Sequence, residues 1–491
     1  MTRALPAALF LFAAYVCASP LVDPDLWWHL AAGRGILASG ALPHAEAWSW
    51  TLAGTPWVDF EWLAQLALEL ARRASGFSGL VALKAAACAL AALLVYDAAR
   101  REEASPAAAF LGALLALSAL RLRAHARPEL ATLVFLPLFL LAARERCRRP
   151  FPLWPLAALT ALWANLHGGW PLGPGVLALA AAGRAWQVWT FDPTARALAL
   201  AAVACGAASF LNPYGWGAHA VVLAHLRHPP AAAGLEEWMS EGLRHFPAFW
   251  LLLAAAAGRL ALDVRQNRRE ALFWVAVLAP LALLGLGGAR FAPLFCLAAP
   301  AYVLSRSAGL PPAPALRLGM PLAAAALALA LVGPTRHRRW SEPVRWDLTP
   351  RESLEFVERE GISGNLFNDY GFGGFIAWAS QGRRPVYYDG RYLFQDLLGR
   401  EDLSQANYAV VRHRPVLDRR EWALVWFDDA AGVYLRRVPE NAAAVARLEF
   451  KLADPAEPEK MLTLPKDSVL AELERRPCAL SKALADYVRK G

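Results

Sequence analysis

Residues 77–97 read FSGLVALKAAACALAALLVYD, an apolar run in which only Lys84 and Asp97 carry charge. A helix that crosses a membrane needs about 20 predominantly apolar residues, so this run is long enough. Working outward from it, ten further apolar runs predict about eleven spans, near 4–20, 77–97, 105–121, 128–143, 151–164, 171–189, 196–211, 247–262, 271–287, 291–305 and 317–334. The sequence therefore predicts a polytopic α-helical membrane protein.

The composition of the whole chain agrees with this prediction. Of the 491 residues, 57% are hydrophobic and 19% are charged, and the mean hydropathy is +0.31. Soluble domains are typically about 45–50% apolar and about 25% charged. The difference disfavours a soluble multidomain enzyme. The six cysteines show no CxxC or CxxH spacing, so the sequence supports neither a disulfide framework nor a zinc site.

The net charge of +9 is spread unevenly along the chain. Residues 336–491 hold 25 Lys and Arg against 24 Asp and Glu, so the first 335 residues carry +8. A protein that binds nucleic acid would concentrate its basic residues on one folded face, whereas here they flank apolar runs. Nucleic acid is therefore not expected as the main partner.

Arginine-rich connections set the expected orientation. The clusters at 144–149 and 265–269 lie in the cytoplasm if the positive-inside rule holds. With eleven spans, the loop 21–76 and the tail 336–491 then both lie outside. We expect a multi-pass protein of the cytoplasmic membrane, with a transmembrane domain over 1–335 that includes the first outer loop. Its active face and its C-terminal domain are expected to be extracytoplasmic.

The tail is predicted to be an α/β domain. Residues 353–360 have the pattern of a helix, and the pair of strands around residues 428–431 has the pattern of a hairpin. The predicted strands are 365–368, 385–388, 408–411, 422–427 and 432–435. Asp389-Gly390-Arg391 comes directly after the second of them and is interpreted as a turn that ends it.

The first outer loop carries acidic residues at the start of two predicted helices. Asp23 is suited to cap a helix with Pro24 at its first position, and the apolar stripe of that helix is suited to lie on a bilayer surface. A second helix from Asp59 to Arg72 repeats the arrangement. Together they predict a shelf of surface helices beside the membrane.

This layout resembles that of the GT-C glycosyltransferases, in which an acidic motif opens a long outer loop after the first span. Members of that family take a sugar from a polyprenyl-phosphate or polyprenyl-diphosphate carrier. A carboxylate at the start of the loop acts there as the catalytic base or helps to hold a metal. The matching positions here are Asp23 and Asp25, so the resemblance implies that they are catalytic. A divalent metal is compatible with this pair, although nothing in the sequence demands one.

A second likeness lies in the tail. Asp369-Tyr370-Gly371 resembles the end of the Trp-Trp-Asp-Tyr-Gly acceptor motif of the catalytic subunit of oligosaccharyltransferase, a GT-C enzyme. Phe367 and Asn368 stand in place of the two tryptophans, which departs from the motif that recognises an Asn-x-Ser/Thr acceptor. The resemblance implies that Asp369 and Tyr370 contact an acceptor.

Several candidate residues also have an ordinary structural explanation. Helix capping alone would explain Asp23, and a favourable interaction with the helix dipole would explain Asp25. Asp59 and Glu61 either begin a helix or contact the acceptor. His29 lies one turn after Asp25, and it either lines the pocket or lies at the membrane interface.

Two arginines and a histidine lie near the ends of predicted spans. Arg127 and Arg290 are expected to bind the donor phosphate, because a guanidinium at membrane depth needs an anionic partner and holds a phosphate bidentately. Snorkelling to lipid headgroups is the alternative. His167 either shapes the rim of the pocket or belongs to a glycine-rich turn.

These observations predict a glycosyltransferase of the cell envelope. It is expected to transfer a hexose or pentose from a polyprenyl-phosphate-linked donor to an unknown glycan, lipid or protein acceptor. Asp23 or Asp25 would take the proton of the acceptor hydroxyl, and the arginines would stabilise the leaving phosphate. The alternative is a non-catalytic GT-C-like scaffold, a binder of lipid-linked glycan, or a transporter. A transporter should carry ionisable groups at mid-span, whereas we find only Lys84 there.

Overall fold

The computed structural model describes residues 4–227, 239–307, 314–333, 342–414 and 417–490. The chain divides into two compact units. The first, called the helical unit, comprises Met1–Leu21 and Val58–Pro343, and the second, called the mixed unit, comprises Val22–Trp57 and Val344–Gly491. This division differs from the one predicted from the sequence, because residues 22–57 pack with the C-terminal residues. The predicted boundary at residue 335 lies outside the described residues.

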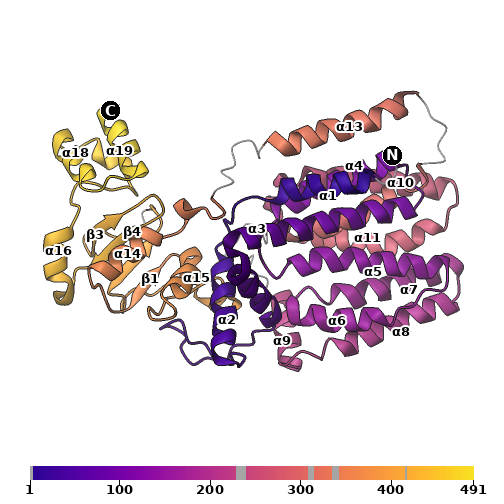
Figure 1. The fold of residues 1–491 in the computed structure, drawn as a ribbon, viewed down its shortest axis with the longest axis horizontal. Helices are drawn as coiled ribbons and strands as arrows, with labels where there is room; N and C mark the ends of the chain where they lie inside the picture. The colour runs from indigo at the N-terminus through magenta and orange to yellow at the C-terminus, as the bar shows by residue number, and fades with distance from the viewer. Residues whose placement is uncertain (1–3, 228–238, 308–313, 334–341, 415–416, 491) are drawn as a thin grey trace. The chain divides into compact units, whose positions relative to one another are not determined.

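Long apolar helices make up the helical unit (Figure 1). They are α1 (Ala4–Cys17), α3 (Trp62–Arg101), α4 (Pro106–Leu122), α5 (Leu130–Arg148), α6 (Pro155–Leu166), α7 (Leu172–Val188), α8 (Pro193–Ala208), α9 (Trp216–Arg227), α10 (Pro247–Arg265), α11 (Glu270–Gly287), α12 (Ala292–Val303) and α13 (Pro314–Val332), with the 3₁₀ turns η3 (Ser240–His245) and η4 (Ala289–Phe291). Each predicted apolar run coincides with a helix, and α9 is an addition.

Three helices of the described residues are long and apolar enough to cross a membrane by length and composition: α3, α10 and α11. Several other apolar helices, α1, α4, α6 and α8 among them, are shorter than that criterion requires. The number of spans and their orientation therefore stay predictions.

Helix α3 contains the predicted surface helix and the predicted span in one element. The two parts meet at Gly76, whose φ of 63° lies in the left-handed region. Glycine adopts this conformation without the steric cost that a side chain would bring. The break therefore lies directly before residues 77–97, where the sequence predicts the span to begin.

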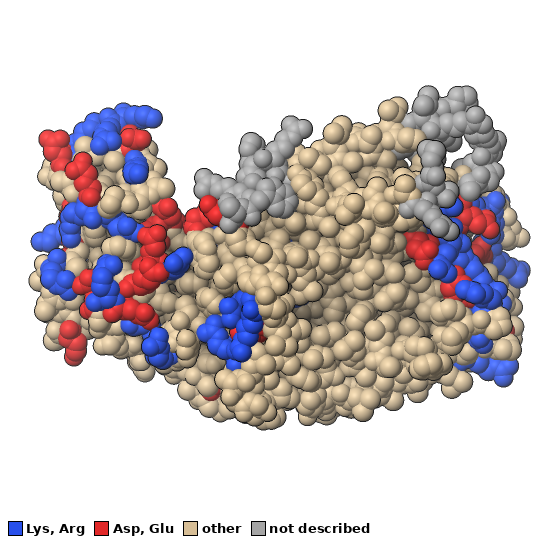
Figure 2. Space-filling view, in the orientation of Figure 1, with Lys and Arg blue, Asp and Glu red and all other residues tan. Residues whose placement is uncertain are grey.

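The surface of the helical unit is suited to lipid. Large apolar side chains are exposed on its helices; Leu200 and Val203 of α8, for example, are 70% and 71% exposed, and Leu283 of α11 is 67% exposed. On the face that Figure 2 shows, a broad area of this unit is uncharged, and charged side chains gather mainly at one end of the helices. An exposed apolar surface of this extent indicates contact with a membrane.

The mixed unit is built around a four-stranded sheet. Its elements are α2 (Asp25–Ser39), η7 (Trp346–Leu348), α14 (Arg351–Arg359), β1 (Leu366–Asn368), α15 (Tyr370–Ala379), η8 (Tyr392–Leu397), β2 (Tyr408–Val411), β3 (Trp422–Phe427), β4 (Gly432–Arg436), η9 (Pro439–Asn441), α16 (Ala442–Leu448), α17 (Pro458–Met461), α18 (Lys466–Glu474) and α19 (Ala479–Lys490). The strand order is β1-β2-β4-β3. Strands β1 and β2 are parallel, and the other pairs are antiparallel.

Four of the five predicted strands are confirmed, and the predicted strand 385–388 is wrong. In its place Val386 forms an isolated bridge with Ser49. The N–H of Val386 donates to the carbonyl of Trp48 at 2.8 Å, and the N–H of Trp50 donates to the carbonyl of Val386 at 3.1 Å. The partner of this apolar segment is thus the first loop and not the sheet, which its residue pattern does not reveal.

Candidate functional site

In the mixed unit, Asp23 and Asp25 lie at the start of α2. The N–H of Asp25 donates to Oδ1 of Asp23 at 3.0 Å. Asp23 is buried, whereas Asp25 is half-buried. Pro24 occupies the N-cap position, so the helix begins one residue later than predicted, within the usual uncertainty of helix ends. The first carboxylate thus supports the backbone that carries the second.

Helix α2 packs against α15 of the same unit. The ring of Trp27 lies 5.0 Å from that of Phe375 and 4.8 Å from that of Trp378, measured between centroids. The backbones approach closely, since a Cβ added at Gly374 would lie 3.1 Å from the nitrogen of Trp28. The prediction that the apolar stripe of this helix lies on a bilayer is therefore wrong for Trp27. His29 is also buried, with its ring 3.6 Å from that of Trp28.

The segment Asp389-Gly390-Arg391 completes the surroundings of Asp25. A Cβ added at Gly390 would lie 2.0 Å from Oδ1 of Asp25 and 3.2 Å from Nε1 of Trp28. Any side chain at position 390 would therefore force the Asp25 carboxylate to move, and only glycine fits as the structure stands. The sequence interpretation of the segment as a plain turn missed this contact, because Asp25 and Gly390 are far apart in the chain.

Arg391 is fully enclosed beside this contact. Its Nη1 lies 2.5 Å from Oε2 of Glu46, and its Nη2 lies 2.7 Å from Oδ2 of Asp389. The guanidinium carbon lies 4.3 Å from the ring centroid of Trp48 and 4.6 Å from that of Trp57. Burial lowers the pKa of Arg391, but the two carboxylates outweigh it and raise the pKa above the usual value. The arginine thus stays charged, and its ion pair with Asp389 fixes the backbone on both sides of Gly390.

Asp369 and Tyr370 lie at the start of α15. Oδ1 of Asp369 accepts from Arg412 at 3.1 Å, and Oδ2 accepts from Arg414 at 3.0 Å. The ring of Tyr370 packs against that of Tyr388, with 5.5 Å between centroids. Asp369 therefore forms ion pairs with Arg412 and Arg414, whose side chains are about half exposed. Neither arginine was among the predicted site residues.

Gly390→Ala is expected to lower the free energy of unfolding. The new Cβ must displace the Asp25 carboxylate, and a forced shift in a packed site typically costs about 1–3 kcal/mol. Thermal unfolding of the whole protein, followed by tryptophan fluorescence, measures the loss. Gly35→Ala is the matched control, because no atom lies within 4 Å of its added Cβ and alanine favours a helix. Equal stability of both variants would contradict the close approach.

In the helical unit, a charged cluster lies where α5 begins, and we call it the arginine cluster: Arg123, Arg127, Glu129, His167 and Arg290. Nη2 of Arg123 donates to Oε2 of Glu129 at 2.7 Å, and both side chains are buried. Arg290 is close enough to act electrostatically on both Glu129 and His167, and Arg127 acts on His167. The structure thus brings together the two predicted phosphate-binding arginines and His167.

The contacts of His167 define its protonation. Its Nδ1 lies 2.7 Å from Oγ1 of Thr132 and accepts from the N–H of Gly169 at 3.0 Å. Because Nδ1 accepts, the proton of the neutral ring is on Nε2. Burial, with help from nearby arginines, lowers the pKa of His167 to about 4 against the opposing effect of Glu129. The ring is therefore neutral at pH 7, with Nε2 placed 3.8 Å from Oε1 of Glu61.

The two remaining predicted carboxylates have different surroundings. Glu61 lies beside His167 and thus next to the arginine cluster. Asp59 is buried, and its Oδ1 accepts from Nε2 of Gln65 at 2.5 Å. Glu129 was missed from the sequence, although its place directly after Arg127 and Pro128 at the start of an apolar run is a detectable signal.

Possible metal ligands are not gathered in larger groups within the part of the chain that the structure describes. Among the residues that the structure describes, no group of three or more His, Cys, Asp or Glu side chains is arranged to hold a metal ion. Asp23 and Asp25 supply two carboxylates, and one oxygen of the first accepts a backbone N–H. A divalent metal shared by this pair of carboxylates stays a prediction.

Comparisons with known proteins show the fold. No family model matches the chain, and no curated protein matches it significantly. Among solved structures, the archaeal oligosaccharyltransferase AglB from Archaeoglobus fulgidus, in complex with an inhibitory peptide and a dolichol-phosphate, has a TM-score of 0.53 at 12% identity, covering 83% of this chain and 69% of its own. ArnT from Cupriavidus metallidurans, in the apo state, has a TM-score of 0.52 at 14% identity, covering 90% of this chain and 98% of its own. The chain therefore has the fold of the GT-C membrane glycosyltransferases.

Proposed function

We propose that this protein is a membrane glycosyltransferase that moves a sugar from a polyprenyl-phosphate-linked donor to an acceptor. The observation that carries the proposal is the arginine cluster of the helical unit, which gathers three arginines around Glu129 and His167. The fold neighbour AglB was solved with a dolichol-phosphate, which supports a lipid-linked donor here. A hexose and a pentose are both compatible with the proposal.

The arginine cluster suits a lipid phosphate for electrostatic reasons. It holds Arg123, Arg127 and Arg290 against Glu129 and the nearby Glu61, so it keeps a net positive charge. His167 is neutral and adds no charge of its own. Arginine at the end of an apolar helix binds phosphate oxygens with two parallel hydrogen bonds. This is the charge that a leaving phosphate needs when its bond to the sugar breaks.

A carboxylate of the acidic pair Asp23 and Asp25 is the base in the proposed reaction. The acceptor oxygen attacks the anomeric carbon, and the bond from that carbon to the phosphate oxygen breaks with its electron pair. The proton of the acceptor hydroxyl passes to a carboxylate, for which Asp25 is the better placed of the pair. Asp25 is half-buried, whereas Asp23 is buried and accepts a backbone N–H. The sugar inverts at the anomeric carbon, because one displacement completes the transfer.

Arg290→Ala is expected to weaken use of the donor by about 10- to 100-fold. A hydrogen bond to a charged group is worth about 1.5–3 kcal/mol, and each 1.4 kcal/mol is tenfold. Arg290→Lys should keep part of the affinity, because it keeps the charge but loses the bidentate geometry. The measurement is sugar release and transfer in proteoliposomes that contain a radiolabelled polyprenyl-phosphate hexose, with membrane extract as the source of acceptor.

Arg244→Ala is the matched control for this experiment. Arg244 belongs to η3 and is exposed. The start of η3 lies near Arg290, because the carbonyl of Met239, directly before η3, accepts from the N–H of Ala289, directly before Arg290. The control therefore removes an exposed arginine of a neighbouring segment. The control variant should keep wild-type donor use. Unchanged donor affinity in Arg290→Ala would remove Arg290 from the site. Binding of the donor by the wild type without any sugar transfer would contradict an enzyme and favour a non-catalytic binder.

A further inference from the structure

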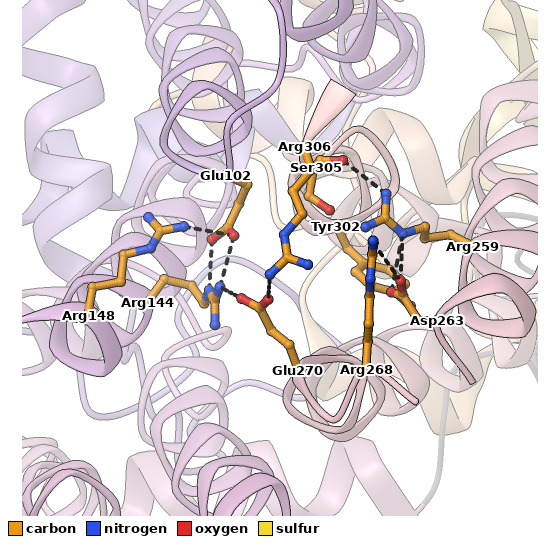
Figure 3. Close-up of polar contacts among 10 residues, drawn as sticks. All are labelled: Glu102, Arg144, Arg148, Arg259, Asp263, Arg268, Glu270, Tyr302, Ser305 and Arg306. Atoms are coloured by element: carbon orange, nitrogen blue, oxygen red, sulfur yellow. Dashed lines mark hydrogen bonds and ion pairs between the residues drawn. The ribbon is translucent and has the colours of Figure 1, made fainter. Parts of the chain in front are cut away.

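A second charged assembly lies at the opposite end of α5. This helix begins beside Glu129 and ends at Arg148, and its 19 residues span about 28 Å. At that end Arg144 donates through Nε to Oε1 of Glu102 at 2.7 Å and through Nη2 to Oε1 of Glu270 at 2.8 Å (Figure 3). Arg148 pairs with the same Glu102 at 2.7 Å. One buried guanidinium therefore ties α5 to α11 and to the residue directly after α3.

The arginines of this end outnumber its carboxylates. Glu145 forms ion pairs with Arg101 and Arg149, each at 2.8 Å. Glu270 forms ion pairs with Arg306 and Arg144. The set thus holds five arginines, which share Glu102, Glu145, Glu270 and Asp97. One positive charge remains. Arg101 and Arg148 are also accessible, with side chains 41% and 31% exposed.

A groove runs beside these arginines. Arg101, Arg144 and Arg148 line it together with the carboxylates that pair with them, Glu102 and Glu145, and with apolar side chains of four helices. Ala98 comes from α3, Leu141 from α5, Trp274 from α11 and Ala301 from α12. The groove therefore combines guanidinium groups with hydrocarbon walls, which matches a molecule with an anionic head and an apolar tail.

A neighbouring pocket of the same end has a different character. It contains Asp263, whose carboxylate lies 3.2 Å from Nε of Arg259 and 3.6 Å from Nη1 of Arg268, and which accepts from the hydroxyl of Tyr302 at 3.1 Å (Figure 3). Nη1 of Arg259 donates to the carbonyl of Ser305 at 2.9 Å. Here polar groups are bonded to one another across α10 and α12, so this pocket joins helices.

We propose that the groove lined by Arg101, Arg144 and Arg148 binds an anionic glycerophospholipid. The phosphate of the headgroup contacts Arg101 and Arg148 at the accessible rim, and an acyl chain lies along Ala98 and Ala301. Basic pockets between membrane helices recognise anionic lipid headgroups in this way. The site is separate from the arginine cluster and does not depend on the proposed transfer reaction.

The test compares binding of phosphatidylglycerol and phosphatidylcholine to the delipidated full-length protein by native mass spectrometry. The wild type should prefer phosphatidylglycerol. R101Q/R148Q should lose about 30-fold of that preference, which corresponds to about 2 kcal/mol if each arginine contributes about 1 kcal/mol. Arg149→Gln is the matched control, because Arg149 pairs with Glu145 but does not line the groove.

A second variant tests the hydrocarbon wall without changing a charge. Ala98→Phe should fill the groove and weaken binding of the long-chain lipid at least several-fold, while thermal unfolding confirms that the variant is folded. Three outcomes would overturn the proposal: no lipid preference in the wild type, an equal loss in Arg149→Gln, or full competition by inorganic phosphate. The last outcome would assign the groove to a soluble anion.

Discussion

Asp25→Asn is expected to lower sugar transfer by about 10²- to 10⁴-fold, the range that a general base typically contributes, while the protein keeps its fold. Asparagine has nearly the size of aspartate and is tolerated in the first turn of a helix, but it takes no proton at neutral pH. The Asp25 carboxylate lies close to Gly390, because a Cβ added at Gly390 would lie 2.0 Å from Oδ1 of Asp25. The measurement is the initial rate of transfer from a polyprenyl-phosphate hexose, with thermal unfolding recorded for the same preparation.

Asp23→Asn separates support of the helix from chemistry. Oδ1 of Asp23 accepts the N–H of Asp25, and the amide oxygen of asparagine is able to accept the same bond. If Asp23 only holds α2 in place, this variant stays active. If it is the base, the variant loses activity while it remains folded. Full activity in both single variants and in the double variant would end the catalytic interpretation of the loop.

The helices were predicted well because the length and periodicity of apolar runs are properties of the local sequence. All eleven runs coincide with helices, and the strands around the hairpin at 428–431 are confirmed. Helix α9 was missed because Trp216–Arg227 is short and ends in basic and histidine residues. The ends of the helices were less accessible: the predicted helix from Asp59 to Arg72 begins only at Trp62 and continues across Gly76 into the apolar run.

The candidate sites were only partly accessible from the sequence, because they depend on partners far apart in the chain. Arg127 and Arg290 could be proposed as phosphate ligands from the sequence because an arginine at the end of an apolar run is unusual in itself; that role stays a prediction. The pairing of Arg391 with Glu46 leaves no local pattern, and the same is true of the contact between Gly390 and Asp25. Such contacts arise only when the first loop packs with the C-terminal residues.

Arg391→Met is expected to be the most destabilising of the single substitutions discussed, by about 3–5 kcal/mol. The side chain is 1% exposed and is held by Glu46 and Asp389, which are themselves buried. Removing one partner of a buried ion pair leaves uncompensated buried charge, and that cost exceeds the value of the pair. The measurement is the loss of thermal stability of the full-length protein relative to Arg351→Met, which breaks an exposed pair with Glu355 and should cost less than about 1 kcal/mol.

A variant that also removes the two carboxylates identifies the cause of this loss. Without the guanidinium, the buried Glu46 and Asp389 lose the cation that both of them contact, and a buried charge without a partner is costly. The triple variant E46Q/D389N/R391M removes the negative charges together with the positive one, so it should recover part of the stability that Arg391→Met loses. Thermal unfolding of wild type, the single variant and the triple variant under the same conditions measures this recovery. No recovery in the triple variant would show that Arg391 acts by packing against Trp48 and Trp57 and not by neutralising the two carboxylates.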